Sequence, residues 1–226
     1  MTQEDFGRIE RHMLLHMQDS AHDKNHIYRV LYNALLIGAA EQAADQEILI
    51  AACLLHDIAR EAQRQDKAVD HALLGGEWAY DFLLEEGWKA DRAERVKSCI
   101  QSHRYRADRH PKSLEAKILF DADKLDVAGA MGVARTLVYG GSFCEPIYRM
   151  DEKGEVRTVG TGEEPSSFFE EFNYKLRNIY DGFYTEKGRT LALLRRNTAI
   201  SFYDGLMAEV QQAHGDGEKI LDGLLT

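Results

Sequence analysis

Apolar residues recur at three- and four-residue steps along most of this chain, which is the spacing of one face of an α-helix. Only three prolines occur, so the periodic segments can run for several turns without interruption. The pattern predicts an all-α fold, and residues after 214 are expected to fray. After a polar N-terminal helix, the expected helices cover 25–41, 46–60, 70–86, 91–103, a long segment from about 113 past 134, 168–180 and 186–210.

The helical periodicity stops between residues 140 and 167, where the chain becomes rich in glycine and charged residues. At most a short hairpin strand is indicated, at Val156–Val159. Irregular segments of this length are often functional lids. We therefore expect one domain over 1–226, in which a lid-like segment at 140–167 separates a helical core at about 20–139 from C-terminal helices at 168–212 that pack on that core.

Four polar residues interrupt the faces that should be buried. His26 lies one turn before an apolar stripe, and the pair His56-Asp57 closes the most apolar helix of the chain. Asp123 is the one charged member of an otherwise small or apolar series. Burying such groups without partners is costly, and imidazole nitrogen with carboxylate oxygen forms the ligand set of Mn²⁺, Fe²⁺, Zn²⁺ or Ni²⁺. The pattern predicts that these four side chains share a divalent cation inside a helical bundle.

Composition narrows the class of protein and its partners. A chain with 44% hydrophobic and 29% charged residues is typical of a soluble globular protein, and a net charge of −10 argues against an extended nucleic-acid partner. The three cysteines are far apart and form no CxxC pair, so we expect reduced core thiols. No segment has the apolar length of a membrane span, and we expect a cytoplasmic protein.

The order of these motifs, a His, then His-Asp, then Asp, resembles the HD-domain phosphohydrolase superfamily over roughly the first 135 residues. The runs His103–Arg106, Leu114–Asp126 and Gly129–Arg135 are similar to the YpgQ/YedJ-like branch of that superfamily, and the similarity extends to about Glu209. The resemblance implies an all-helical HD-domain bundle with a C-terminal helical extension. It also implies the following metal ligands: His26, His56, Asp57 and Asp123.

The resemblance implies a metal-dependent phosphohydrolase, most simply a Mn²⁺-dependent enzyme that cuts a nucleoside or deoxynucleoside triphosphate between its α and β phosphates and releases pyrophosphate. Ni²⁺, Co²⁺, Fe²⁺, Zn²⁺ and Mg²⁺ remain alternative ions. Two other reactions stay open: a 5′-nucleotidase and a two-metal enzyme of dinucleotides. A nucleotide-binding sensor and a purely structural adaptor are the non-enzymatic alternatives. Apolar stripes on the last helices would also suit a homodimer.

Further polar residues are candidates for supporting roles. His71 and His103 could hold a second metal, with Asp57 as a bridge, or could contact phosphate. Glu61 follows Asp57 by four residues and could accept a proton from the attacking water. Asp126 could orient a ligand, although it could also be an exposed residue like Asp121. The candidate phosphate contacts are Arg104, Lys124, Arg106 and Lys175.

Overall fold

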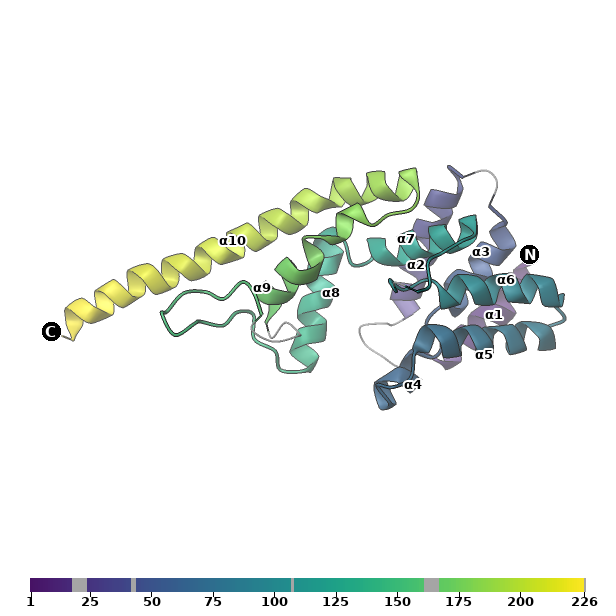
Figure 1. Ribbon diagram of the computed structural model, residues 1–226, viewed down its shortest axis with the longest axis horizontal. Helices are drawn as coiled ribbons and strands as arrows, with labels where there is room; N and C mark the ends of the chain where they lie inside the picture. Colours follow the sequence, from purple (N-terminus) through teal and green to yellow (C-terminus); the bar gives the residue numbers. More distant parts are fainter. Residues whose placement is uncertain (18–23, 42–43, 107, 161–166, 226) are drawn as a thin grey trace. The chain divides into compact units, whose positions relative to one another are not determined.

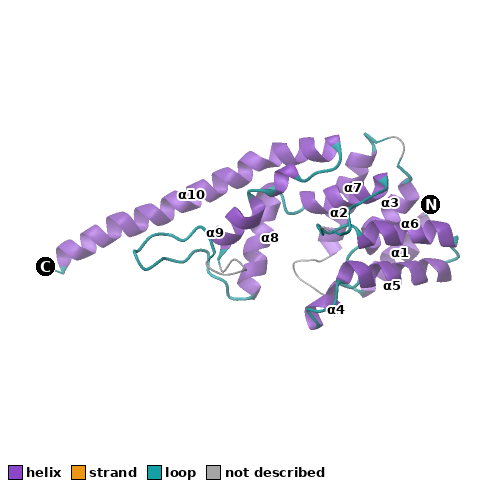
Figure 2. Ribbon diagram, viewed as in Figure 1, coloured by secondary structure: helices purple, strands orange, loops and turns teal. Residues whose placement is uncertain are grey.

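The computed structural model describes residues 1–17, 24–41, 44–106, 108–160 and 167–225. Over these residues the chain forms helices joined by loops, and no β-strand appears among them (Figure 2). An antiparallel bridge between Met150 and Val156 is the one pairing of strand type in the described part of the chain. The all-α prediction is confirmed, and the expected hairpin strand is reduced to this single bridge.

Contacts within the chain define two compact units. The core unit comprises Met1–Asp126 and Gly182–Leu191, and the C-terminal unit comprises Val127–Asp181 and Ala192–Thr226. The single domain over 1–226, with its C-terminal helices packed on the core, stays a prediction. The helices of the core unit are α1 (Gln3–Leu15), α2 (Lys24–Gly38), α3 (Gln46–Leu55), α4 (Arg60–Gln65), α5 (His71–Glu85), α6 (Ala90–Gln101) and α7 (Leu114–Leu125).

Helix α3 is the centre of the core unit (Figure 1). Asp45 caps its first turn by accepting hydrogen bonds from the backbone N–H groups of Glu47 and Ile48. Almost every residue after Glu47 is buried, because α1, α2, α6 and α7 all pack against this helix. An apolar surface all round is what such a central position requires.

The buried helix ends earlier than its pattern predicts. Helix α3 stops at Leu55 rather than near Arg60, and residues 56–59 form a turn before α4 begins. The backbone N–H of Arg60 closes this turn on the carbonyl of Asp57 at 2.9 Å. Both His56 and Asp57 are buried, so the turn holds two polar side chains inside the helical bundle.

The long helix expected from residue 113 past 134 is also wrong, because the chain breaks after Leu125 and resumes as α8 (Gly129–Ser142). Gly129 has φ +67°, a conformation that glycine adopts without steric cost and other residues avoid. A side chain there would also meet Arg195, whose Cβ would lie 2.7 Å from the added Cβ. The apolar periodicity of the sequence continues through this point, but the helix does not.

The C-terminal unit has an aromatic core in which Phe168, Phe169 and Phe172 pack with Tyr203. The helix expected at 168–180 is instead a series of short pieces, and α10 continues past residue 214, so the expected fraying is wrong. Of the segment 140–167, the first three residues extend α8, and residues 161–166 lie outside the described part; its role as a lid stays a prediction. The remaining elements are α9 (Phe168–Glu171), the π-helical turn η1 (Phe172–Leu176), the 3₁₀ turn η2 (Ile179–Asp181) and α10 (Glu186–Leu224).

The cysteines and the helix lengths bear on two further expectations. Cys53 and Cys99 are buried, and burial raises the pKa of the Cys99 thiol to about 12, as expected of inert core residues. Cys144 is exposed, so the expectation of a core position is wrong for this residue, which lies in the loop after α8. Among the described helices, none combines the length and apolar character needed to cross a bilayer.

Candidate metal centre

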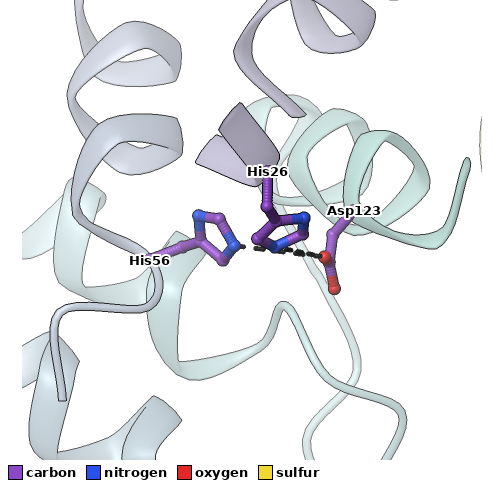
Figure 3. Close-up of side chains that lie close together, drawn as sticks. All are labelled: His26, His56 and Asp123. Atoms are coloured by element: carbon purple, nitrogen blue, oxygen red, sulfur yellow. Dashed lines mark ion pairs between the residues drawn. The ribbon is translucent and has the colours of Figure 1, made fainter. Parts of the chain in front are cut away.

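Six ligand-type side chains from five parts of the core unit lie close together, with Asp57 at their centre. The first group consists of His26 on α2, His56 at the end of α3 and Asp123 on α7 (Figure 3). The second group consists of Asp57 itself, His71 at the start of α5 and His103 just after α6. Within each group, one potential ligand atom per residue lies within 4.8 Å of the others.

The first group surrounds a space suited to a cation. Asp123 Oδ1 lies 3.5 Å from His26 Nε2 and 4.0 Å from His56 Nε2. Asp57 Oδ2 lies 3.6 Å and 3.8 Å from the same two nitrogens. These distances are too long for strong hydrogen bonds. Two ligand atoms that bind the same ion, each at ~2.1 Å from it, are separated from one another by roughly 3–4 Å. The observed spacing therefore fits coordination of one shared ion.

Asp57 joins the two groups through its two carboxylate oxygens. While Oδ2 faces His26 and His56, Oδ1 lies 3.1 Å from His71 Nε2 and 3.7 Å from His103 Nε2. A carboxylate in this position can bridge two cations, as carboxylates do in two-metal sites. The sequence left open whether His71 and His103 contribute to the centre, and the structure brings both of them to it.

Hydrogen bonds behind the rings determine which nitrogen of His56 and of His103 is protonated. His56 Nδ1 donates to the Cys53 carbonyl at 2.8 Å, and His103 Nδ1 donates to the Ile100 carbonyl at 2.6 Å. Because a carbonyl only accepts, Nδ1 carries the proton and a neutral ring keeps its lone pair at Nε2. His56 Nε2 is buried and has no hydrogen-bond partner within the described residues. A cation would satisfy this atom, so the residues present fit a bound metal.

Asp126 supports His26 from behind. Its Oδ2 accepts a hydrogen bond from His26 Nδ1 at 2.7 Å, which leaves His26 Nε2 to face the centre. Arg29 donates to both carboxylate oxygens, from Nε at 2.6 Å and from Nη2 at 3.0 Å. Asp126 is 1% exposed, so the alternative of a solvated surface residue is wrong. Carboxylates in this arrangement commonly orient a metal-binding histidine.

The protonation states also suit metal coordination. Burial favours a raised pKa for Asp57, but the neighbouring histidines, His56 foremost, hold it well below its usual range. Burial, reinforced by the charge of His56, lowers the pKa of His103 to about 3. At neutral pH the centre therefore contains an ionised Asp57 and a neutral His103, the forms that bind metals.

The other predicted residues lie in different surroundings. Glu61, in the first turn of α4, is bound through both oxygens by Arg64 at 2.6 Å and 2.7 Å. Lys124 donates to the Gly182 carbonyl at 3.1 Å and lies over two aromatic rings. Lys175 belongs to the C-terminal unit, where it pairs with Glu171 at 3.7 Å.

Arg104 borders the second group, with Nη1 3.5 Å from His71 Nδ1, and Arg106 donates to the Tyr105 carbonyl. Sequence reasoning missed two residues here. Gln63 Oε1 lies 2.5 Å from His71 Nδ1, and Arg60 Nη1 lies 3.2 Å from the same atom. Their position just after the His-Asp pair was the available signal.

Asp121 is a further residue that the sequence analysis misplaced. It is completely buried rather than exposed, and it accepts hydrogen bonds from the backbone N–H groups of Tyr184 and Thr185 and from the Thr185 hydroxyl. These bonds attach the segment before α10 to α7. Its role is therefore structural, and its burial was not predicted because Asp121 lies outside the apolar series that Asp123 interrupts.

Comparisons with known proteins identify the family to which this part of the chain is similar. The model of the HD domain family matches residues 24–128, which include all six gathered side chains. The uncharacterized protein YpgQ of Bacillus subtilis is 30% identical over 197 residues, covering 85% of this chain and 86% of YpgQ. A solved structure of YpgQ in complex with ADP has a TM-score of 0.69 at 26% identity and covers 91% of this chain and 97% of its own.

A second solved structure, a predicted HD superfamily hydrolase from an uncultured Thermotogales bacterium, is 30% identical with a TM-score of 0.61. That alignment covers 92% of each chain. A third, an HD-superfamily hydrolase from Bacillus thuringiensis, has a TM-score of 0.69 at 26% identity and covers 92% of this chain and 98% of its own. The similarity therefore extends over nearly the whole length of each protein.

Proposed function

We propose that this chain, which belongs to the HD-domain family, is a metal-dependent phosphohydrolase that converts nucleoside or deoxynucleoside triphosphates to monophosphates and pyrophosphate. One observation carries the proposal. Four histidine Nε2 atoms and the Asp123 carboxylate converge around the Asp57 carboxylate, in a helical unit that would otherwise bury these polar groups at a cost. A divalent cation bound by these groups would offset the cost of burying them.

A bound divalent cation supplies two effects: it lowers the pKa of a water and offsets negative charge on a phosphoryl oxygen. We propose that His26, His56, Asp57 and Asp123 hold it, with Mn²⁺ as the preferred ion. The Asp123 side chain is 29% exposed whereas Asp57 is 5% exposed, so Asp123 is the ligand that a substrate in solvent reaches first.

Hydrolysis adds water at the α-phosphorus, breaks its bond to the bridging oxygen and releases pyrophosphate. We propose Glu61 as the acceptor of the water proton, since it follows Asp57 by four residues in the turn and helix that border the centre. This role requires the Glu61 carboxylate to leave Arg64 when substrate binds. The choice of a nucleotide is supported by the ADP bound to YpgQ.

The proposal is tested by a Mn²⁺-supplemented screen of nucleotides in which phosphate and pyrophosphate are detected separately. The expected result is equimolar monophosphate and pyrophosphate from a triphosphate, with no product from Asp57→Ala. Orthophosphate alone, released from a monophosphate, would instead establish a 5′-nucleotidase. Nucleotide binding without turnover by metal-loaded protein would establish a sensor.

The second group favours one further candidate, a two-metal phosphohydrolase of dinucleotides. The observation behind it is the position of His71 and His103 at Oδ1 of Asp57, the carboxylate oxygen that does not face the first group. Two bound ions per chain, together with cleavage of a dinucleotide and inertness toward triphosphates, would favour this reaction over the first.

A further inference from the structure

Two arginine side chains, those of Arg60 and Arg104, reach the second group, and a third, that of Arg106, lies in the same loop as Arg104. Arg60 Nη1 and Arg104 Nη1 both approach His71 Nδ1, at 3.2 Å and 3.5 Å. Arg106 follows Arg104 by two residues in the loop after α6, and its charge acts on the Arg104 guanidinium. Arg60 comes from a different element, as the first residue of α4. We name Arg60, Arg104 and Arg106 the arginine cradle.

The positive charge of the arginine cradle is poorly neutralised by the protein. Arg104 has one ion pair, a 4.0 Å approach to Asp70, and Asp70 already accepts a 2.6 Å hydrogen bond from Arg109. Within the described ranges, neither Arg60 nor Arg106 forms an ion pair. Arg60 donates to the neutral Gln63 amide at 3.1 Å, and Arg106 donates to a backbone carbonyl at 3.0 Å.

Holding these like charges together costs free energy. Burial, followed by the charges of Arg106 and Arg60, lowers the pKa of the Arg104 guanidinium. The Arg104 side chain is nevertheless 25% exposed, so a ligand can reach it. An anion placed among the three guanidiniums would offset their repulsion and satisfy their donors, and guanidinium groups bind phosphate with two parallel hydrogen bonds.

We propose that the arginine cradle binds the terminal phosphates of the substrate and makes the enzyme selective for nucleotides with a phosphate chain. This inference rests on the proposed function. The cradle lies at His71, on the Oδ1 side of Asp57, whereas the first group lies on the Oδ2 side. In the proposed arrangement an α-phosphate lies at the first group, and its β and γ phosphates lie at the guanidiniums beside His71 Nδ1. A monophosphate has no group to place there.

Isothermal titration of the metal-loaded protein with inorganic pyrophosphate tests the cradle directly. Arg60→Gln and Arg104→Gln should each weaken pyrophosphate binding by about tenfold or more, the effect of losing one charge-assisted hydrogen bond. Arg60→Lys should recover part of the loss because the charge is kept. Arg11→Gln is the matched control, since it removes one positive charge from an exposed position on α1 and should bind like the parent.

Metal content and circular dichroism show whether each variant is folded with its centre intact. Under that condition, parent-like pyrophosphate affinity in both Gln variants would overturn the inference. If the variants lose pyrophosphate binding but the parent turns over no nucleotide, the cradle stands and the proposed function fails. If the parent hydrolyses triphosphates and the variants keep its KM, the proposed function stands and the cradle is wrong.

Discussion

Replacing Asp126 with Asn tests whether the hydrogen bond behind His26 matters for metal binding. The substitution keeps the shape of the side chain but removes its charge and exchanges one acceptor for a donor. Because Arg29 donates to both oxygens and His26 donates to one of them, an amide nitrogen at either position faces a donor. The conflict with His26 is relieved only if its proton moves to Nε2, the atom that faces the centre.

The expected magnitude follows from this geometry. A ring protonated at Nε2 cannot bind a cation through that atom, and a ring that keeps its tautomer loses the carboxylate that increases its basicity. Either outcome should weaken metal binding by about 10- to 100-fold, which corresponds to roughly 1.4–2.7 kcal/mol. Since Asp126 is buried and also holds Arg29, the metal-free variant should be less stable than the parent as well.

Calorimetric titration of metal-free protein with Mn²⁺ measures the affinity, and thermal unfolding of the metal-free form measures the stability separately. Asp121→Asn is a matched control, because it changes another buried aspartate of α7 whose partners are Tyr184 and Thr185. The control should lose stability and keep its metal affinity. A folded Asp126→Asn protein that binds Mn²⁺ within twofold of the parent would show that the hydrogen bond from His26 to Asp126 does not support metal binding.

Three further predictions address the second group, the proton acceptor and an ion pair. If Asp57, His71 and His103 hold a second ion, His103→Ala should lower the metal content by one ion per chain, as counted by elemental analysis, while His26→Ala should weaken the other site. Glu61→Gln should lower kcat about a hundredfold with little change in KM; an unchanged kcat would place the proton acceptor elsewhere. Although burial opposes it, the Arg109 hydrogen bond lowers the pKa of Asp70 to about 2, below its usual 3.8. The stability from this pair is therefore present above 3.8 and lost as pH falls toward 2, so Asp70→Asn should flatten the decrease in Tm over that range, and an unchanged slope would contradict the pair's contribution.

The sequence patterns predicted those helices in which the buried faces set the spacing of the apolar residues. Helix α3 was predictable because every face of it is covered, and Asp123 was notable because it interrupts an apolar series. The same patterns could not show the break at Gly129, since apolar spacing continues across it while the backbone turns through a positive φ. They also could not show that α3 ends at Leu55, because the residues after it are equally buried.

Only some residues of the candidate site could be predicted from the sequence, namely the polar residues that interrupt or close an apolar helix. His26 and the His56-Asp57 pair do so, whereas Gln63 and Arg60 lie in a polar stretch that looks like any exposed segment. Their approach to His71 depends on the turn at 56–59, which is a property of the packed core unit. Asp57 Oδ2 faces the first group and Oδ1 faces the second group, and this arrangement likewise depends on packing and not on spacing in the sequence.

In the proposed metal centre, the carboxylate of Asp57 joins the two groups of ligands. Anomalous diffraction from crystals grown with Mn²⁺ tests it most directly, with Asp57→Ala as the comparison. We expect an anomalous peak coordinated by His26, His56, Asp57 and Asp123 in the parent, and its loss in a folded variant. A parent crystal with no peak among these side chains, or a variant that keeps the peak at full occupancy, would contradict it.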